Sequence, residues 1–297
     1  MGWPGIQETQ SEQKKETVPT REQLFVKPKR QKRGLKVALY GPEAVGKTHT
    51  LLTFPPPIYV INFEPNGVVL LLHKFGDKEI YECPTWEGWI GKGKEDDVTI
   101  ATESIMSLEQ AINSLSDVTE GTIGIDSVTH LWRYAEVWMK RVKVPELARK
   151  SGNKVFEFDW AYAYALYRRL VLKCLVRPVN VVLTGQTRDV YIGDKTTGEW
   201  EARWMGETPH MVDVLVRMEK RVTAEVGKDN IARNKVSYIS TIEKVRPMRE
   251  LVKDTRIEIQ DLTYDKLIDA LVNKLKIPHD ILGLEEPSVP GGDTAAS

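Results

Sequence analysis

Short apolar runs of strand length alternate with helix-compatible segments along the first two thirds of the chain. The runs expected to form buried strands are residues 35–40, 58–63, 79–83, 122–127 and 180–184. Apolar residues at helical spacing occupy residues 108–115, 130–150 and 159–176. A capping-box sequence at 107–110 should open the first of these helices, and Pro145 should break the second. Strands that alternate with helices predict a parallel sheet with helices on both faces.

The pattern changes after the last of these strands. Residues 190–204 predict a hairpin, and residues 212–222 and 236–245 alternate apolar and polar positions as an antiparallel pair does. A last helix should begin after Thr263 and end before Pro278. The predicted fold class is therefore α/β, with a mostly parallel sheet flanked by helices and antiparallel strands at one edge.

Composition divides the chain into three parts. Residues 1–33 are polar and end in a run of Lys and Arg, which predicts a disordered or partner-binding basic arm. Residues 34–277 should form the folded core, and the Pro- and Gly-rich residues 278–297 a flexible tail. The basic run fits either a contact with a phosphate backbone or a solvated linker.

The overall composition is that of a soluble globular protein. Hydrophobic residues make up 41% of the 297 residues and charged residues 28%, with a formal net charge of zero. A neutral molecule does not attract nucleic acid as a whole, so any such binding must come from local patches. No apolar run reaches the length of a membrane span, so we expect no membrane association and a cytoplasmic location.

Residues 41–48 fit the pattern G-x-x-x-x-G-K-[ST], with a strand before it and a helix-compatible segment after it. In this phosphate loop, backbone N–H groups surround phosphate, the lysine reaches the β- and γ-phosphates, and the hydroxyl ligates Mg²⁺. The alternative is a glycine turn beside a chance Lys-Thr pair. We expect ATP with Mg²⁺ to be bound by Gly41, Pro42, Glu43, Ala44, Val45, Gly46, Lys47, Thr48 and His49.

Two carboxylates end predicted strands at the same edge of the sheet. Asp126 can hold Mg²⁺ through water and accept a hydrogen bond from Thr48. In many ring-forming AAA+ motors a glutamate directly follows this aspartate and activates water, but here Ser127 follows. Glu64 is therefore the expected general base, a role that contributes roughly 10²- to 10⁴-fold to the rate. The alternative is that Glu64 is an ordinary acid at the end of a strand.

At this point the chain resembles the RecA-like recombinases, over roughly residues 34–260. Residues 41–48 are close to the RecA form of the phosphate loop, and Ile125-Asp126-Ser127-Val128-Thr129 is similar to the family's metal-binding strand. Glu64 stands at the position of its catalytic glutamate, and Gln186 matches the glutamine that senses γ-phosphate. The resemblance implies a RecA-like P-loop ATPase core, most similar to the short, core-only phage-type nucleotide-binding and single-strand annealing ATPases.

The resemblance also implies partners. It implies an ATPase stimulated by single-stranded DNA, in a homo-oligomeric ring or filament of a prokaryotic or infected host cell, with a single-strand binding protein as a further partner. The expected DNA contacts are Arg149, Lys150, Lys154, Arg188, Lys195, Trp200, Arg203 and Trp204. Trp200 and Trp204 are equally well explained as cross-strand pairs or as residues packed on a neighbour.

Lys244 and Arg246 lie on a late strand, where RecA-like filaments place cations that reach the next subunit's γ-phosphate. Ordinary surface charges on an edge strand are the alternative. Two other functions remain open for the chain as a whole. One is a nucleotide-gated scaffold or packaging motor, and the other is a P-loop small-molecule kinase that does not act on DNA.

Overall fold

In the computed structural model, residues 33–85, 97–146, 160–226, 232–246 and 257–284 are described. The chain divides into the units Met1–Gln31 and Lys32–Ser297, and every described residue belongs to the second. The predicted basic arm therefore lies almost wholly outside the described residues. Along the described part of the chain, no helix is both long enough and apolar enough to cross a membrane.

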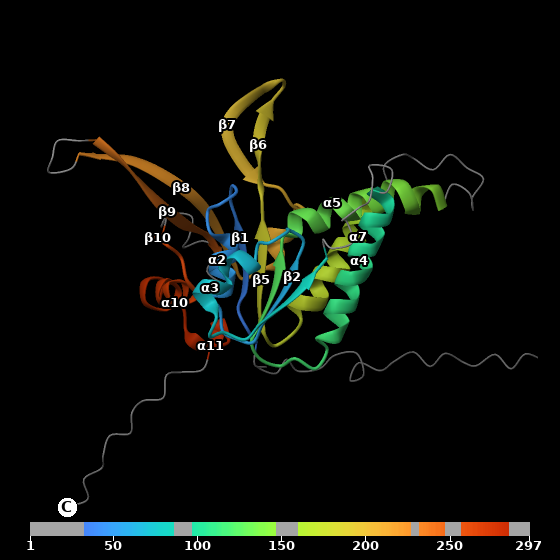
Figure 1. The fold of residues 1–297 in the computed structure, drawn as a ribbon, viewed down its shortest axis with the longest axis horizontal. Coiled ribbons are helices and arrows are strands. Elements are labelled where there is room, and N and C mark those ends of the chain that lie inside the picture. The colour runs from blue at the N-terminus through green and yellow to red at the C-terminus, as the bar shows by residue number, and fades with distance from the viewer. Residues whose placement is uncertain (1–32, 86–96, 147–159, 227–231, 247–256, 285–297) are drawn as a thin grey trace, which may run out of the picture. The chain divides into compact units, whose positions relative to one another are not determined.

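A sheet of eight strands organises this unit, in the order β10-β9-β8-β1-β5-β4-β2-β3 (Figure 1). Six of its strands are joined by parallel pairings. These six are β1 (Lys36–Tyr40), β2 (Ile58–Asn62), β3 (Ile80–Pro84), β4 (Thr122–Asp126), β5 (Asn180–Gly185) and β8 (Val214–Val226). Every residue of β1 and β4 is buried, as expected of strands covered on both faces.

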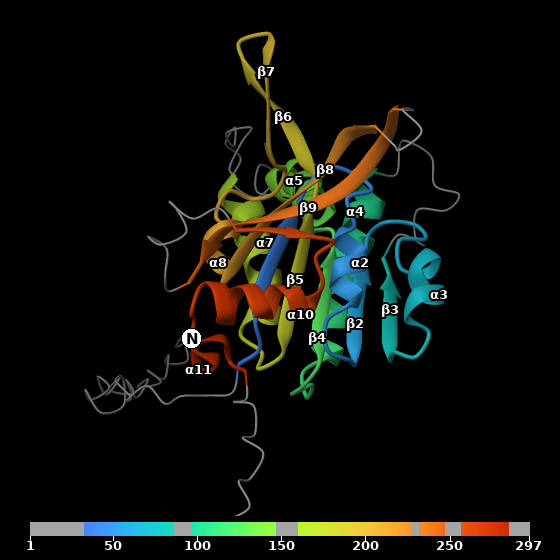
Figure 2. The same cartoon turned by 90° about the vertical axis from the view of Figure 1, so that its left-hand side faces the viewer.

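Antiparallel strands complete one edge of the sheet. β9 (Ala232–Val245) is antiparallel to β8, and β10 (Ile257–Gln260) is antiparallel to β9. The predicted fold class, a mostly parallel sheet flanked by helices with antiparallel strands at one edge, is confirmed by this arrangement. β10 was not foreseen, because four residues with alternating burial give too short a pattern. A separate two-stranded hairpin, β6 (Thr187–Ile192) and β7 (Lys195–Ala202), stands away from the sheet (Figures 1 and 2).

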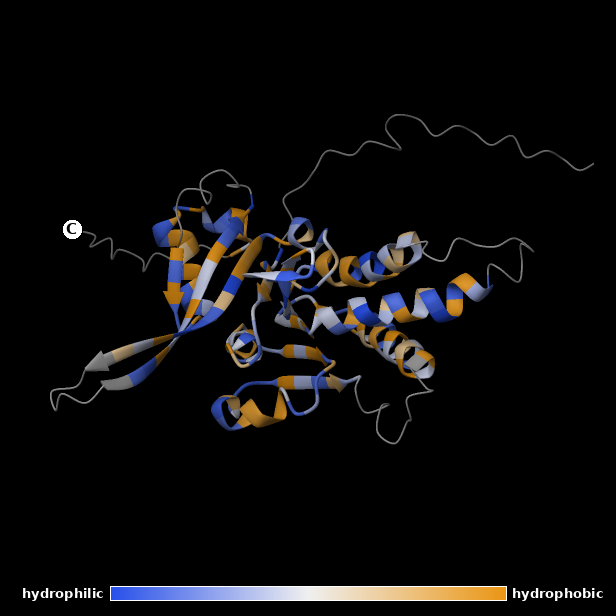
Figure 3. Cartoon of the chain, turned by 90° about the horizontal axis from the view of Figure 1, so that it is seen from above, coloured by the Kyte–Doolittle hydropathy of each residue, from blue (hydrophilic) through white to orange (hydrophobic). Residues whose placement is uncertain are grey.

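Helices cover both faces of the sheet (Figure 1). One hydrophobic cluster joins β1, β4 and β5 to α4 (Asp97–Ser114), α5 (Val128–Trp138) and α7 (Trp160–Leu175). The other joins β1, β2 and β8 to α2 (Lys47–Leu52), α10 (Tyr264–Asp269) and α11 (His279–Leu282). Hydrophobic and hydrophilic residues are interleaved along the same strands and helices, as amphipathic elements require (Figure 3). Three shorter elements, η1 (Val69–Leu71), α3 (Leu72–Phe75) and α8 (Thr208–Met211), border the sites described below.

Three sequence-based expectations about where helices form and end are wrong. α4 is already helical at Asp97, so residues 107–110 lie inside the helix and cap nothing. The helix that contains α5 continues to residue 146 through a π-helical turn, Met139–Lys143, where the hydrogen-bond ladder adjusts to the amide hydrogen that Pro145 lacks. Residues expected in the flexible tail form α11, where Leu282 is 2% exposed.

Candidate functional site

The phosphate loop joins β1 to α2. Gly46, the residue before α2, has φ +93°, a left-handed conformation that glycine adopts without steric cost. The side chain of Lys47 folds back over the loop, and its ammonium donates to the carbonyl oxygens of Gly41 at 2.9 Å and Pro42 at 2.6 Å. Burial lowers the pKa of Lys47, with Asp126 opposing that effect. The loop therefore holds a partly desolvated cation where an anion would meet it.

Asp126, at the end of β4, is 2% exposed and has a hydroxyl donor on each carboxylate oxygen. Thr48 donates to Oδ2 at 2.7 Å, and Thr184 of β5 donates to Oδ1. One hydroxyl in this arrangement comes from the phosphate loop itself. A hydroxyl and a carboxylate, together with water and phosphate oxygens, are the hard oxygen ligands that Mg²⁺ prefers. The residues present therefore fit a magnesium ion bound with a triphosphate.

Glu64 and Gln186 meet across the carboxyl ends of β2 and β5. The Gln186 amide Nε2 donates to Glu64 Oε1 at 3.0 Å, so residues 122 positions apart in the sequence are in direct contact. Burial raises the pKa of Glu64, as does the nearby Asp126, while the hydrogen bond from Gln186 and the charge of Lys47 lower it. His130 Nδ1 lies 3.6 Å from the same Oε1, but burial lowers the pKa of His130 and favours its neutral form. Glu64 is thus oriented mainly by an amide.

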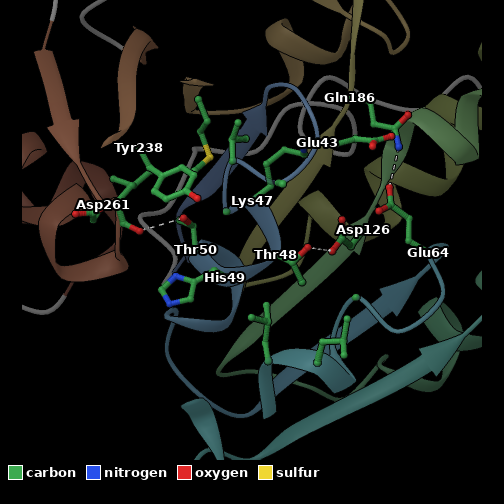
Figure 4. A pocket seen from close by; sticks show the side chains of 18 of the residues that line it. Glu43, Lys47, Thr48, His49, Thr50, Glu64, Asp126, Gln186, Tyr238 and Asp261 are labelled. Atoms are coloured by element: carbon green, nitrogen blue, oxygen red, sulfur yellow. Dashed lines mark hydrogen bonds between the residues drawn. The ribbon is translucent and has the colours of Figure 1, made fainter. Parts of the chain in front are cut away.

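One cavity of about 880 Å³, which we call the nucleotide pocket, is lined by Lys47, Thr48, Glu64, Asp126 and Gln186 (Figure 4). Figure 4 shows Glu64 and Gln186 at one end, Lys47 in the middle, and Tyr238 and Asp261 at the other end. If Glu64 acts on the γ-phosphate, which the lysine of such loops reaches, the end that holds Glu64 would be the γ-phosphate end. A nucleoside would then occupy the end that holds Tyr238.

The nucleoside end was missed by the sequence analysis. Tyr238 comes from β9, and Asp261 and Leu262 follow β10, so they are close to the phosphate loop only through the pairing of these edge strands. Thr50 of α2 donates to the Leu262 carbonyl oxygen at 3.0 Å and fixes this segment to the loop. No local motif marks these positions, since each is an ordinary residue of a strand or turn. The lining of the nucleotide pocket also includes His49, Leu70, Leu71 and Lys74.

The expected DNA contacts are only partly described, and none of the described ones lines the nucleotide pocket. Outside the described residues lie Arg149, Lys150 and Lys154. Exposed on or beside the β6–β7 hairpin are Arg188, Lys195 and Arg203. Arg188 is paired with Glu201 across the hairpin at 2.8 Å, which offsets part of its charge.

The two tryptophans of the hairpin differ. Trp204 is 8% exposed, and its ring lies 5.3 Å from that of Tyr40 and directly against Gly185, where an added Cβ would be 2.5 Å from it. The expectation that Trp204 offers an exposed stacking face to DNA is wrong, because the ring packs in the chain's own core. Trp200 is half-buried, and its ring meets Tyr40 edge-on with the Arg217 guanidinium 5.4 Å from its centre.

The two late cations also differ. Lys244 Nζ donates to the carbonyl oxygens of Pro209 and Val212 in the same chain, the second at 3.3 Å. Within this chain its ammonium is held by carbonyl oxygens, so a reach of Lys244 to a neighbouring nucleotide, which stays a prediction, would require these two contacts to break. Arg246 follows the end of β9, and its side chain is exposed.

One family of known proteins matches most of this chain. The model of a family described as an AAA domain, AAA_24, matches residues 33–240, from the residues before β1 into β9. No curated protein matches the chain. Among solved structures, the crystal structure of the RadB recombinase is similar, with a TM-score of 0.40 and 12% sequence identity over 77% of this chain and 86% of that chain. The family match contains the phosphate loop, Asp126, Glu64 and Gln186, and the chain therefore belongs to the AAA domain family of P-loop ATPases.

Proposed function

We propose that this protein hydrolyses ATP in the nucleotide pocket, with Glu64 as the general base. The observation that carries the proposal is the 3.0 Å hydrogen bond from Gln186 to Glu64, which orients a partly buried carboxylate at the γ-phosphate end of the pocket. A base must be held within reach of the attacking water, and a pKa raised toward neutrality strengthens proton abstraction. Asp126 is less suited to this role, since both of its oxygens already accept hydrogen bonds.

The remaining residues have distinct roles in this proposal. Lys47 would exchange the carbonyl oxygens of its own loop for the β- and γ-phosphate oxygens. Thr48 and Asp126 would hold the magnesium ion, which when bound neutralises phosphate charge and fixes the phosphates' orientation. Gln186 would act as a positioning residue, since it contacts Glu64 and faces the γ-phosphate end.

We further propose that the nucleotide controls binding to single-stranded DNA, in annealing or recombination by a homo-oligomer. The support comes from the β6–β7 hairpin, which begins at Thr187, immediately after Gln186. It also returns there, because the Arg203 amide donates to the Gln186 carbonyl oxygen at 2.8 Å. Both ends of an exposed hairpin bearing Arg188 and Lys195 therefore meet at the residue that faces γ-phosphate. Arg149, Lys150 and Lys154, which lie outside the described residues, would supply further phosphate contacts. Lys244 and the exposed Arg246 remain the cations proposed to act on a neighbouring subunit.

The test is a titration of the ATPase rate with single-stranded DNA, paired with DNA binding measured by fluorescence anisotropy. We expect the DNA to raise the rate, and we expect ATP to tighten binding in the wild type but not in Lys47→Ala. Binding should weaken steeply with salt, because contacts to phosphate release counterions. Arg188→Ala on the hairpin should reduce this salt dependence, whereas Lys274→Ala, which removes an exposed charge outside the hairpin, serves as its control.

The results separate the two halves of the proposal. ATP hydrolysis without any DNA binding at low salt would leave the ATPase standing and remove the DNA function, in favour of a nucleotide-gated scaffold, a motor or a small-molecule kinase. DNA binding that ignores ATP in both the wild type and Lys47→Ala would remove the control by nucleotide. A protein without ATP turnover under any condition would contradict the role of Glu64.

A further inference from the structure

A second cavity, of about 660 Å³, lies at the foot of the β6–β7 hairpin. It shares no lining residue with the nucleotide pocket. Its wall is formed by α5, the start of α7, β7 and the end of β1, which are distant in the sequence. We call it the aromatic cavity, because its lining includes Tyr40, Trp132, Trp160, Tyr164, Trp200 and Trp204.

The rings form two groups. On the helices, Trp132 stacks on Trp160 with centres 6.1 Å apart and lies 5.2 Å from Tyr164. On the sheet side, Tyr40 contacts the rings of Trp200 and Trp204. Tyr164 is 42% exposed, so the helical group reaches the surface. The cavity thus has a stacked pair of rings on its helical side and an edge-on ring contact on its sheet side. The exposed Tyr164 lies where the cavity meets solvent.

Cations lie around this cavity. Lys140 Nζ is 5.0 Å from the centre of the Trp160 ring, and Arg217 is 5.4 Å from that of Trp200. Arg188 lies on the lining itself and is exposed. Of the two acids on the lining, Glu201 is paired with Arg188, and Glu136 faces the cavity from α5. Arg217 is half-buried and lies 3.7 Å from both Glu219 and Glu243, so the exposed cations at the cavity are Lys140 and Arg188.

We propose that the aromatic cavity takes up one unpaired base from a bound single strand, an inference that rests on the proposed DNA function. Aromatic faces stack on any base, and the exposed Lys140 and Arg188 at the cavity would neutralise the phosphates on either side of it. Glu136 can accept a hydrogen bond from a base N–H, which explains a carboxylate inside a site for a polyanion. The base leaves the strand and enters the protein, rather than lying on an exposed face of the hairpin.

The same charges disfavour other occupants. An organic cation, which aromatic rings also bind, would have to displace Lys140 or Arg217 from the ring that it contacts. An apolar ligand would leave Glu136 without a hydrogen-bond donor. The volume lies within the range typical of small-ligand pockets, so it accommodates a single base.

The test compares two strands of equal length, oligothymidylate and a deoxyribose-phosphate strand without bases. Both are titrated against the full-length protein by fluorescence anisotropy, with tryptophan fluorescence followed in parallel. We expect the wild type to prefer oligothymidylate and its tryptophan fluorescence to be quenched by it. Trp160→Ala should lower the affinity for oligothymidylate about 5- to 100-fold and leave that for the baseless strand unchanged. Trp160→Phe, which keeps a ring, should restore most of the affinity.

Tyr164→Ala provides a second, more exposed variant, and Tyr81→Ala is its matched control. Tyr81 is 49% exposed on β3, which contributes nothing to the cavity lining. Unchanged ATP turnover in the absence of DNA and an unchanged melting temperature show that each variant is folded. Tyr164→Ala should reproduce the selective loss, and Tyr81→Ala should bind both strands like the wild type.

Each contrary result has its own meaning. A wild type that binds both strands equally leaves DNA binding intact and overturns the base site alone. A Trp160→Ala variant that loses both strands equally, or neither, also overturns it. A wild type that binds neither strand overturns the DNA function itself. Quenching that depends on protein concentration without any oligonucleotide identifies a second copy of this chain as the occupant, and the base site is then wrong.

Discussion

The two cavities of this protein are built in opposite ways. The phosphate end of the nucleotide pocket is formed by residues at the carboxyl ends of adjacent parallel strands, and direct hydrogen bonds join them. The aromatic cavity is assembled from helices, a hairpin and a strand end, and ring contacts rather than hydrogen bonds dominate it. The residues that make directional hydrogen bonds therefore lie at strand ends, where the sheet fixes their position. The aromatic rings, which can stack in several ways, are brought together by tertiary packing.

Gly185 is the point where the two regions touch. Its carbonyl oxygen accepts a hydrogen bond at 3.2 Å from the amide of Gly41, the first residue of the phosphate loop. The position that a side chain of Gly185 would occupy faces the ring of Trp204, which lines the aromatic cavity. Gln186 is the next residue after Gly185. Substitutions in the nucleotide pocket and at this junction therefore test whether the two regions behave differently.

The largest expected effect belongs to Glu64→Gln. Loss of the general base should lower the ATP turnover rate roughly 10²- to 10⁴-fold, while ATP affinity stays within a factor of about two or three. Steady-state turnover and equilibrium binding of a fluorescent ATP analogue measure the two quantities. Glu120→Gln, the same change at an exposed residue between α4 and β4, should leave both unaltered. Undiminished turnover in Glu64→Gln would mean that the base lies elsewhere.

Gly185→Ala should disturb both regions at once. The added methyl group would lie 2.5 Å from the Trp204 ring, an overpacking that typically costs about 1–3 kcal/mol of folding free energy. Chemical denaturation measures that loss, and ATP affinity should fall with it, because the strand that anchors Gly41 must shift. Gly206→Ala is the matched control, since a Cβ there meets nothing within 4 Å. Equal stability of the two variants would show that the Trp204 side chain moves aside for the methyl group without a loss of folding free energy.

Tyr238→Ala should affect only the nucleoside end of the nucleotide pocket. If the ring stacks on the base, ATP affinity should fall by about 1 kcal/mol, the lower end for an aromatic stack, because Tyr238 is 38% exposed. Inorganic tripolyphosphate, which has no base, should bind both proteins alike in a competition assay, and Tyr238→Phe should resemble the wild type. Equal loss of tripolyphosphate binding would instead indicate damage to the phosphate loop.

The smallest expected effect is a shift in pH dependence. Glu64 acts as a base only when ionised, and burial and Asp126 raise its pKa, so turnover should decline at a higher pH than for an ordinary glutamate as acid is added. The hydrogen bond from Gln186 stabilises the ionised form and lowers that pKa. Gln186→Ala should therefore move the acidic limb of the kcat–pH profile further toward high pH. A limb that stays in place or moves to lower pH would contradict this account.

The sequence predicted the parallel strands and the phosphate end of the pocket because both depend on local patterns. Glu64, Asp126 and Gln186 each lie at or just beyond the end of an apolar run, and the ends of parallel strands share one edge of the sheet. Tyr238 and Asp261 could not be placed in this way, since their position depends on the pairing of β9 with β10, a strand of four residues. An exposed stacking role was expected for Trp204 because tryptophan serves core packing as well as ligand binding, and the sequence does not distinguish the two.

The paired hydroxyls on Asp126 have a consequence for how fast the protein can capture its substrate. Because Thr48 and Thr184 already fix both carboxylate oxygens, the side chain keeps one rotamer before any metal ion arrives. Ordering a mobile side chain on binding costs about 0.5–1.5 kcal/mol, and this residue would be spared that loss. Association of magnesium-bound ATP should then be limited by diffusion to the protein, rather than by a rearrangement of Asp126. Its association rate constant should therefore depend on solvent viscosity.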